Sequence, residues 1–188
     1  SFPSPKAAGD SRSVKFIEVP DGVYVNRGRV ARGEQEDANA ISGALNTNEV
    51  EARKIVEAVV AQVMAAPANN PPSIGIITMN EQQKDLILAL LDETGEQRVI
   101  DLKNNEINKR NYLFVRSLEK VQGDERDYIY ISMAFSKDPE TGKLSQNFGP
   151  LIQVGSERRL NVAVTRARRE IFVYASFRPS DLNTDSSK

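Results

Sequence analysis

Residues 155–170 read GSERRLNVAVTRARRE, and this stretch decides how the rest of the chain is interpreted. It places arginines at positions 158, 159, 166, 168 and 169, with apolar residues between them. Ser156 is a favourable N-cap and the apolar residues recur at roughly helical spacing, so the pattern predicts a helix. The next residues, Ile171 to Phe177, are mostly β-branched or aromatic and predict a buried strand. Arg166 is therefore expected near the end of the helix, just before the turn into the strand.

A second stretch bears on what Arg166 does. A guanidinium supported by two regular elements is permanently charged and offers a planar fork of donors that suits phosphate oxygens, although an arginine-rich helix alone is more often a solvated surface. Residues 121–127 read VQGDERD and lead into the β-prone run from Tyr128 to Phe135. Glu125 lies 41 positions before Arg166. The two stretches together, in this order, are a far more specific functional signal than either stretch alone.

The pair resembles motifs V and VI of superfamily 1 helicases, in the branch that includes the nonsense-mediated-decay helicase and its bacterial relatives. Motif V of that family looks like Q-G-x-E-x-D, and motif VI looks like R-R-L-N-V-A-x-T-R-A-R. The matching positions are Gln122, Gly123, Glu125 and Asp127, followed by residues 158–168. The resemblance covers roughly residues 73–177. It implies a second, C-terminal RecA-like domain, which is an α/β fold with a mainly parallel sheet flanked by helices.

The resemblance also implies roles around a nucleotide. Arg166 corresponds to the arginine finger that reaches the γ-phosphate of ATP on a partner domain. Glu125 corresponds to a ribose or nucleotide contact, and Gln122 with Gly123 shapes the turn that links nucleotide to nucleic acid. Arg159 belongs to the same cleft, where it and Arg158 are expected to pair with Asp124 or Asp127 rather than touch phosphate. The residue types leave other roles open: surface charge for Arg166, a helix-start carboxylate for Glu125 and backbone freedom for Gly123.

Two further residues are implied to contact nucleic acid. The strand and turn from Ser73 to Gln83 resemble the family pattern I-G-I-[IV]-T-P-[YF]-x-x-Q, with Thr78 and Gln83 matching and Met79-Asn80 replacing the Pro-aromatic pair. Ser117 precedes Gln122 as a Ser or Thr does in the family. The alternative for Thr78 is a hydroxyl that satisfies a helix-start amide. Arg168 and Arg169 are interpreted as surface or strand-flanking charge.

Half of an ATP site is missing from the sequence. No stretch fits the phosphate cradle G-x-x-x-x-G-K-[ST]. Residues 90–93 (LLDE) resemble a magnesium motif, but they fall at the end of a helical pattern. ATP with Mg²⁺ is therefore expected to be held mainly by an upstream first RecA-like domain, and no metal ligands are assigned here. The alternatives are a non-catalytic nucleic-acid-docking or protein-interaction module and a regulator that supplies an arginine in trans.

Composition limits the remaining classes. The chain has 188 residues, 39% hydrophobic and 27% charged residues, and a net charge of −1, which suits one globular domain without a global basic field. Cysteine and histidine are both absent, which excludes disulfides, thiol chemistry and histidine sites. No apolar run reaches membrane-spanning length. The expected partners are single-stranded DNA or RNA and the upstream domain, with a cytoplasmic location and no membrane.

The rest of the chain is assigned from its turn-forming residues and the periodicity of its apolar residues. A flexible lead-in is expected over 1–13, the domain over 14–178 and a polar tail over 179–188. Residues 22–45 are predicted to be a loop or insertion, with its arginines near nucleic acid as the alternative. The segments expected in order are a strand (Val14–Val19), a helix (Asn46–Ala66) capped by Asn46 with Glu49, a strand (Ser73–Met79), a helix capped by Asn80, an irregular segment (Gly95–Lys109), strands (Tyr112–Arg116, Tyr128–Phe135) and a hairpin-like excursion (Ser136–Pro150). Alternating strands and helices predict a parallel sheet, with both motifs at the carboxyl ends of strands.

Overall fold

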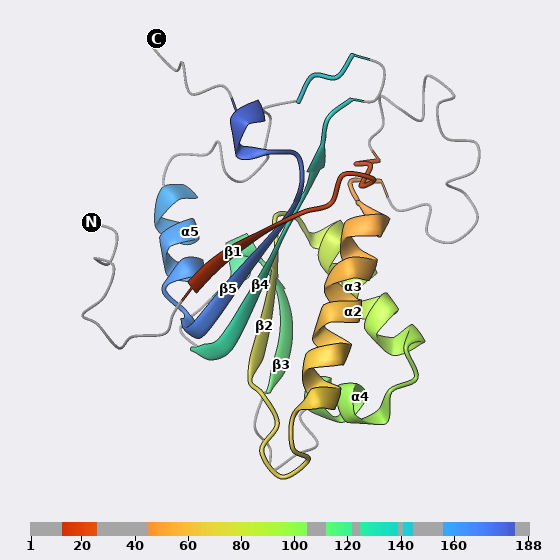
Figure 1. Cartoon of the computed structure of the whole chain (residues 1–188), viewed down its shortest axis with the longest axis vertical. Helices are drawn as coiled ribbons and strands as arrows, with labels where there is room; N and C mark the ends of the chain where they lie inside the picture. The colour runs from red at the N-terminus through yellow and green to blue at the C-terminus, as the bar shows by residue number, and fades with distance from the viewer. Residues whose placement is uncertain are drawn as a thin grey trace.

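A single parallel sheet organises the molecule. The computed structural model describes residues 13–25, 45–104, 112–121, 125–138, 141–144 and 156–182 (Figure 1). Within these residues, five strands lie in the order β1-β5-β4-β2-β3, and all neighbours run parallel. The strands are β1 (Ser13–Glu18), β2 (Ile74–Thr78), β3 (Leu113–Ser117), β4 (Arg126–Ser136) and β5 (Ala167–Ser176). The predicted α/β, RecA-like architecture is confirmed.

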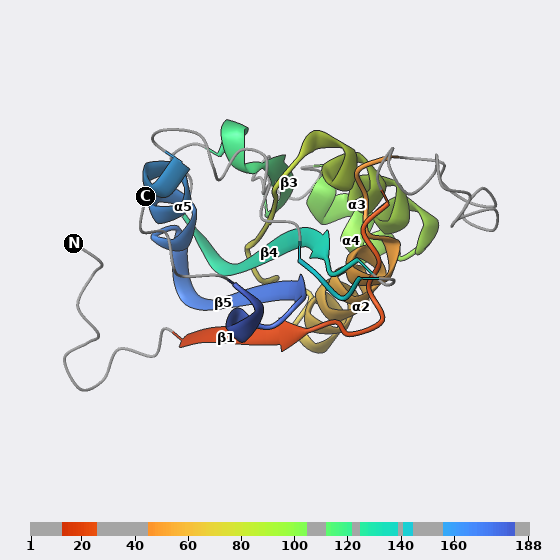
Figure 2. The same ribbon diagram turned by 90° about the horizontal axis from the view of Figure 1, so that it is seen from above.

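Helices cover both faces of this sheet (Figures 1 and 2). One face carries α2 (Glu49–Ala65), α3 (Glu81–Glu93) and α4 (Gln97–Lys103), and the opposite face carries α5 (Ser156–Val164). Two short 3₁₀ helices, η2 (Leu118–Lys120) and η4 (Pro179–Asp181), follow β3 and β5. Among the described helices, none has the length and apolarity needed to cross a membrane.

The apolar core forms two layers, one on each face of the sheet. The larger layer joins the buried sides of α2, α3 and α4 to the strands, and the smaller one joins Ala163 of α5 to Phe114 and Ile129. Strand β2 lies between them and is buried along its whole length, as its continuous apolar run predicts. A Cβ at Gly75 would lie 2.6 Å from Cζ of Phe114, so glycine is what lets this ring pack onto β2.

Most of the predicted segments are confirmed. All five strands match predicted ones, although β4 begins at Arg126 and β5 at Ala167, earlier than the apolar runs suggest. Helix α3 is capped as predicted, because the side chain of Asn80 accepts a hydrogen bond from the backbone N–H of Gln83 at 2.7 Å. Its predicted apolar positions are all buried: Leu86, Ile87, Leu90 and Leu91.

The predicted start of α2 is wrong. Asn48, not Asn46, is the N-cap: its backbone is extended and its side chain accepts from the N–H of Glu51 at 3.1 Å. Asn46 instead adopts a left-handed backbone with φ of 67°. Its carbonyl accepts from the side-chain amide of Asn80 at 3.0 Å, so it belongs to the turn before the helix.

The irregular segment predicted over Gly95–Lys109 contains a short helix, α4. Val99 and Leu102 on this helix are buried in the larger apolar layer. Tertiary packing therefore stabilises a helix of seven residues that is too short to show a clear periodic pattern.

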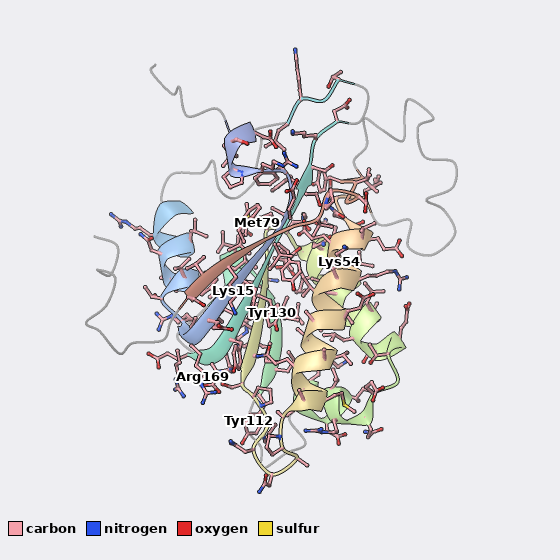
Figure 3. The ribbon with its side chains drawn as sticks, viewed as in Figure 1. Lys15, Lys54, Met79, Tyr112, Tyr130 and Arg169 are labelled. Atoms are coloured by element: carbon pink, nitrogen blue, oxygen red, sulfur yellow. The ribbon has the colours of Figure 1, made fainter. Side chains whose placement is uncertain are left out.

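The two edges of the sheet are chemically different, and both carry predicted site residues. We call the edge where β4 and β5 begin the amino edge, and the opposite one, where β2 and β3 end, the carboxyl edge. Figure 3 shows Arg169 at the amino edge and Met79 at the carboxyl edge. The prediction that motifs V and VI fall at carboxyl ends is wrong, because each motif precedes its own strand: Glu125 comes just before β4, and Arg166 just before β5.

Candidate functional site

The amino edge brings the two motifs into direct contact. The backbone N–H of Arg126 donates to the carbonyl of Arg166 at 2.9 Å, and the Cα of Arg126 is paired with that of Ala167. Strands β4 and β5 are neighbours, so residues 41 positions apart in the sequence meet at the start of the same ladder. This contact is the geometric basis for treating the two motifs as one site.

Arg166 lies where the sequence predicts it, in the turn between α5 and β5. Its backbone N–H donates to the carbonyl of Ala163 at 3.3 Å, and its own carbonyl accepts from Arg126. Ala163 and Ala167 on either side are buried. The Arg166 side chain, which is partly buried, therefore starts from a backbone fixed on both sides.

Ion pairs across the amino edge join the acids of the first motif to Arg168 and Arg169. The Nε of Arg168 lies 3.1 Å from a carboxylate oxygen of Glu125, and both side chains are more than half exposed. The Nε of Arg169 lies 3.9 Å from Asp127, and its guanidinium lies over the ring of Tyr128 at 6.0 Å. The exposure of Arg168 and Arg169 at the start of β5 agrees with their interpretation as surface or strand-flanking charge. The sequence interpretation expected Arg158 and Arg159 to pair with Asp124 or Asp127, whereas the register of β4 against β5 brings Asp127 next to Arg169.

Arg126 is a buried charged residue at the amino edge that the sequence interpretation did not select. Its side chain is 8% exposed, and its guanidinium lies 4.9 Å from the centre of the Phe114 ring. A terminal nitrogen of Arg126 also donates to the carbonyl of Glu125 at 2.8 Å. Arg116 lies over the same ring at 4.7 Å. Arg126 occupies a variable position of motif V, so the motif itself gave no reason to select it.

The two predicted nucleic-acid contacts meet at the carboxyl edge. Thr78 and Ser117 are Cα partners in the β2–β3 ladder, and they are 0% and 1% exposed. The hydroxyl of Thr78 donates to the carbonyl of Asn80 at 2.7 Å, so the alternative role at a helix-start amide belongs to Asn80 instead. The hydroxyl of Ser117 donates to the carboxylate of Glu81.

Glu81 forms ion pairs with two lysines at the carboxyl edge. Its carboxylate lies 2.6 Å from Nζ of Lys84 and 3.2 Å from Nζ of Lys120. Hydrogen bonds from Lys84, Ser117 and Lys120 lower the pKa of the Glu81 carboxyl to about 2, against a smaller opposing effect of burial. The side chain is therefore a carboxylate at neutral pH. Neither Glu81 nor Lys120 was selected from the sequence.

The interior near the carboxyl edge contains a buried polar cluster. It is formed by Asn48, Glu51, Gln83, Ser132 and Ser176. Glu51 is fully buried and accepts from the hydroxyls of Ser132 at 2.7 Å and Ser176 at 3.3 Å, and from the N–H of Ala134 at 2.7 Å. Burial raises the pKa of Glu51 to about 7, although these donors favour the carboxylate.

Gln83 closes the same cluster. It accepts from the N–H of Asn48 at 2.8 Å and donates to the carbonyl of Asn48 at 3.0 Å and the hydroxyl of Ser132 at 3.1 Å. The Gln of the family-like pattern thus joins α2, α3 and β4 inside the protein.

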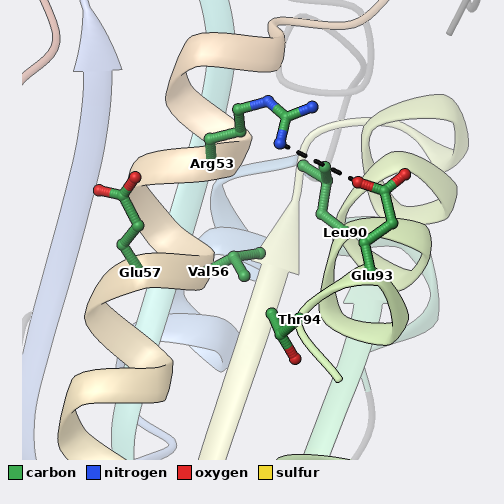
Figure 4. Close-up of a pocket in the computed structure, with 6 residues that line it drawn as sticks. All are labelled: Arg53, Val56, Glu57, Leu90, Glu93 and Thr94. Carbon is green, nitrogen blue, oxygen red and sulfur yellow. Dashed lines mark ion pairs between the residues drawn. The ribbon is translucent and has the colours of Figure 1, made fainter. Parts of the chain in front are cut away.

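The described residues also line two hollows. A groove of about 220 Å³ between α2 and α3 is lined by Arg53, Val56, Glu57, Leu90, Glu93 and Thr94 (Figure 4). Arg53 crosses it, 2.7 Å from Glu49 and 4.0 Å from Glu93. A second hollow of about 330 Å³ adjoins the amino edge, where Asp127, Tyr128 and Arg169 face the proline-rich loop after α2. The first contains no residue of either motif.

Several predictions fall outside the described residues. Gln122, Gly123 and Asp124 are among them, as are the side chain of Arg159 and most of the predicted loop over 22–45. The described part of the excursion after β4 contains an antiparallel bridge between Lys137 and Leu144, as a hairpin-like segment would. The roles of Gln122, Gly123 and Arg159 stay predictions.

Comparison with known proteins adds a family and relatives. The family model described as "AAA domain" matches residues 8–177. The chain is 30% identical over 184 residues to "Uncharacterized ATP-dependent helicase MG140" of Mycoplasma genitalium, covering 97% of this chain and 14% of that protein. It is 33% identical over 139 residues to "Regulator of nonsense transcripts 1 homolog" of Arabidopsis thaliana, covering 74% of this chain and 10% of that protein.

A solved structure is also similar. It is the C-terminal domain of a possible DNA helicase from Lactobacillus plantarum WCFS1, with 16% identity and a TM-score of 0.45, and the match covers 73% of this chain and 76% of that one.

Proposed function

The chain belongs to the AAA domain family, in the superfamily 1 helicase-like branch that its motifs predicted, and on that premise we propose that it is the C-terminal RecA-like motor domain of an ATP-dependent DNA or RNA helicase. It supplies Arg166 as the arginine finger and part of the groove for single-stranded nucleic acid. One observation carries the proposal. The backbone N–H of Arg126 donates to the carbonyl of Arg166 at 2.9 Å, so motifs V and VI lie side by side at the amino edge.

The side chains at the amino edge fit a nucleotide in their chemistry. A guanidinium at Arg166 suits the phosphate oxygens of ATP, and the carboxylate of Glu125 suits the hydroxyls of a ribose. Bound ATP with Mg²⁺ would supply the phosphoryl group that passes to water. Because this sequence has no phosphate cradle, most of the phosphate contacts are assigned to an upstream RecA-like domain of the same protein.

Arg166 is a better candidate for the finger than its neighbours. Arg168 and Arg169 have side chains that are 59% and 62% exposed, and they are paired with Glu125 and Asp127. The backbone of Arg166 is held by both α5 and β4. Preorganised charge stabilises a transition state without reorganisation at the moment of reaction, which favours the arginine on the fixed turn.

The test is the nucleic-acid-stimulated ATPase rate of the full-length protein. Arg166→Ala is expected to lower that rate roughly a thousandfold, the effect typical of an arginine finger, while ATP still binds. Arg53→Ala is the matched control, because it removes an arginine from the groove between α2 and α3, away from both motifs. If the ATPase rate of Arg166→Ala equals the parent rate, Arg166 is a surface charge without a catalytic role, and the non-catalytic docking module becomes the better proposal.

A further inference from the structure

Ser117 cannot reach nucleic acid in the arrangement that the structure shows. Its side chain is 1% exposed, and its hydroxyl donates to the carboxylate of Glu81. If Ser117 contacts a strand of nucleic acid, as the family resemblance implies, Glu81 has to give up that hydroxyl. The question is what replaces the carboxylate.

The groups around Glu81 form a set of donors for an anion. The Ser117 hydroxyl and the Nζ of Lys120 both meet the same carboxylate oxygen, and the Nζ of Lys84 meets the other. They come from three different elements, β3, η2 and α3. Lysine ammonium groups and serine hydroxyls are among the donors that proteins use to hold the phosphates of nucleic acids.

Exposure shows that an outside anion has access. Lys120 is 67% exposed and Glu81 is 34% exposed, whereas Lys84 is 20% exposed and also lies 3.0 Å from Asp85. Lys120 is therefore the donor most open to solvent, and the Glu81 carboxylate contacts all three donors. The geometry resembles an anion site whose occupant is supplied by the protein.

We propose that Glu81 occupies the position of a backbone phosphate of single-stranded nucleic acid, and that the phosphate displaces it to bind Ser117, Lys84 and Lys120. This inference rests on the proposed function and names the residues that meet the strand. Because the pKa of Glu81 is lowered to about 2, protonation does not vacate the position at neutral pH. A competing anion is required, and each bound phosphate adds a salt-dependent contribution to affinity.

The first experiment measures binding of fluorescein-labelled oligothymidine and oligouridine to the 188-residue chain by fluorescence anisotropy. Glu81→Gln is expected to tighten binding about two- to fivefold, the size of one exposed charge contact. Asp92→Asn is the matched control: it removes the same charge and breaks the ion pair with Lys103 near the other end of α3. It is expected to leave the affinity unchanged, because distant exposed charges are screened by salt.

The second experiment tests the donors. Lys120→Ala is expected to weaken binding about two- to fivefold and to make the slope of log affinity against log salt less negative by about 0.7, as loss of one single-strand phosphate contact requires. An oligothymidine with uncharged methylphosphonate linkages is expected to bind the parent chain and Glu81→Gln equally. Both results would tie the gain to phosphate.

The contradicting outcomes differ from those of the ATPase test. Equal effects of Glu81→Gln and Asp92→Asn, or unchanged binding by Lys120→Ala, would overturn the inference while leaving the motor proposal intact. If neither the parent chain nor any variant binds the labelled oligonucleotides, the inference would be overturned and nucleic-acid binding at the carboxyl edge would be excluded. A rate unaffected by Arg166→Ala would overturn the motor proposal alone.

Discussion

The carboxyl edge and the amino edge use similar side chains in opposite settings. At the carboxyl edge, Glu51 is fully buried and its oxygens accept from three donors inside the protein. At the amino edge, Glu125 is half exposed and its carboxylate pairs with Arg168, which solvent also reaches. One carboxylate joins structural elements inside the protein, and the other is exposed to solvent.

The burial of a charged side chain decides its role. Breaking a buried hydrogen-bond network leaves polar groups with neither a protein partner nor water, which lowers stability. An exposed ion pair contributes little to stability, because water can hydrate both charges once the pair is broken. Stability should therefore depend on the carboxyl edge, and nucleotide chemistry on the amino edge.

The largest effect is expected from truncating Glu51. Glu51→Ala leaves the N–H of Ala134 and the hydroxyls of Ser132 and Ser176 without their acceptor, and should lower the free energy of unfolding by about 3–5 kcal/mol. Arg168→Ala, at the exposed pair, should change it by less than about 1 kcal/mol. Urea unfolding followed by circular dichroism measures both. Equal losses in the two variants would break the comparison.

The second prediction concerns pH. Burial raises the pKa of Glu51 to about 7 in the folded chain, from 4.5. Its stabilising contribution is therefore fully present below pH ~4.5 and is lost as pH rises through ~7, a change on the order of 3 kcal/mol. Glu51→Gln cannot titrate, so its stability should change less than that of the parent over this window. Parallel pH curves for the two chains would show that Glu51 titrates normally.

The third prediction separates the two asparagines before α2. Asn48→Ala removes the cap on Glu51 and the contact of its amide with Ser176 at 2.8 Å, and should cost about 2 kcal/mol. Asn46→Gly keeps the left-handed backbone available and should cost less than about 0.5 kcal/mol. Thermal unfolding of the two variants checks the order. A larger loss for Asn46→Gly would restore the helix start predicted from the sequence.

Much of the fold could be predicted because its elements are long and apolar. Strand β2 is a continuous buried run, and the helical spacing from Leu86 to Leu91 identified α3. Helix α4 was missed because its buried contacts are Val99 and Leu102 alone. The start of α2 was misplaced because Asn46 and Asn48 both suit a cap, and only the tertiary contacts of the turn decide between them.

The pairing of the two motifs could be predicted from the sequence, but their place on the sheet was predicted wrongly. The motif pattern selected Glu125 and Arg166, and the structure brings their strands together. The assignment to the carboxyl edge failed although the order of motif and strand is visible in the sequence. Pairwise contacts were hidden for a different reason. The contact of Arg126 with Phe114 depends on how the strands are arranged, and the contact of Glu81 with Ser117 joins residues 36 positions apart. No local sequence pattern predicts either contact.

The most direct test of the division between the edges combines two measurements on Arg166→Ala in the full-length protein. The account predicts a nucleic-acid-stimulated ATPase rate lowered roughly a thousandfold, together with an affinity for labelled oligonucleotide that stays at the parent value. An unchanged ATPase rate, or an affinity that falls along with the rate, would contradict the assignment of nucleotide chemistry to the amino edge and nucleic-acid binding to the carboxyl edge.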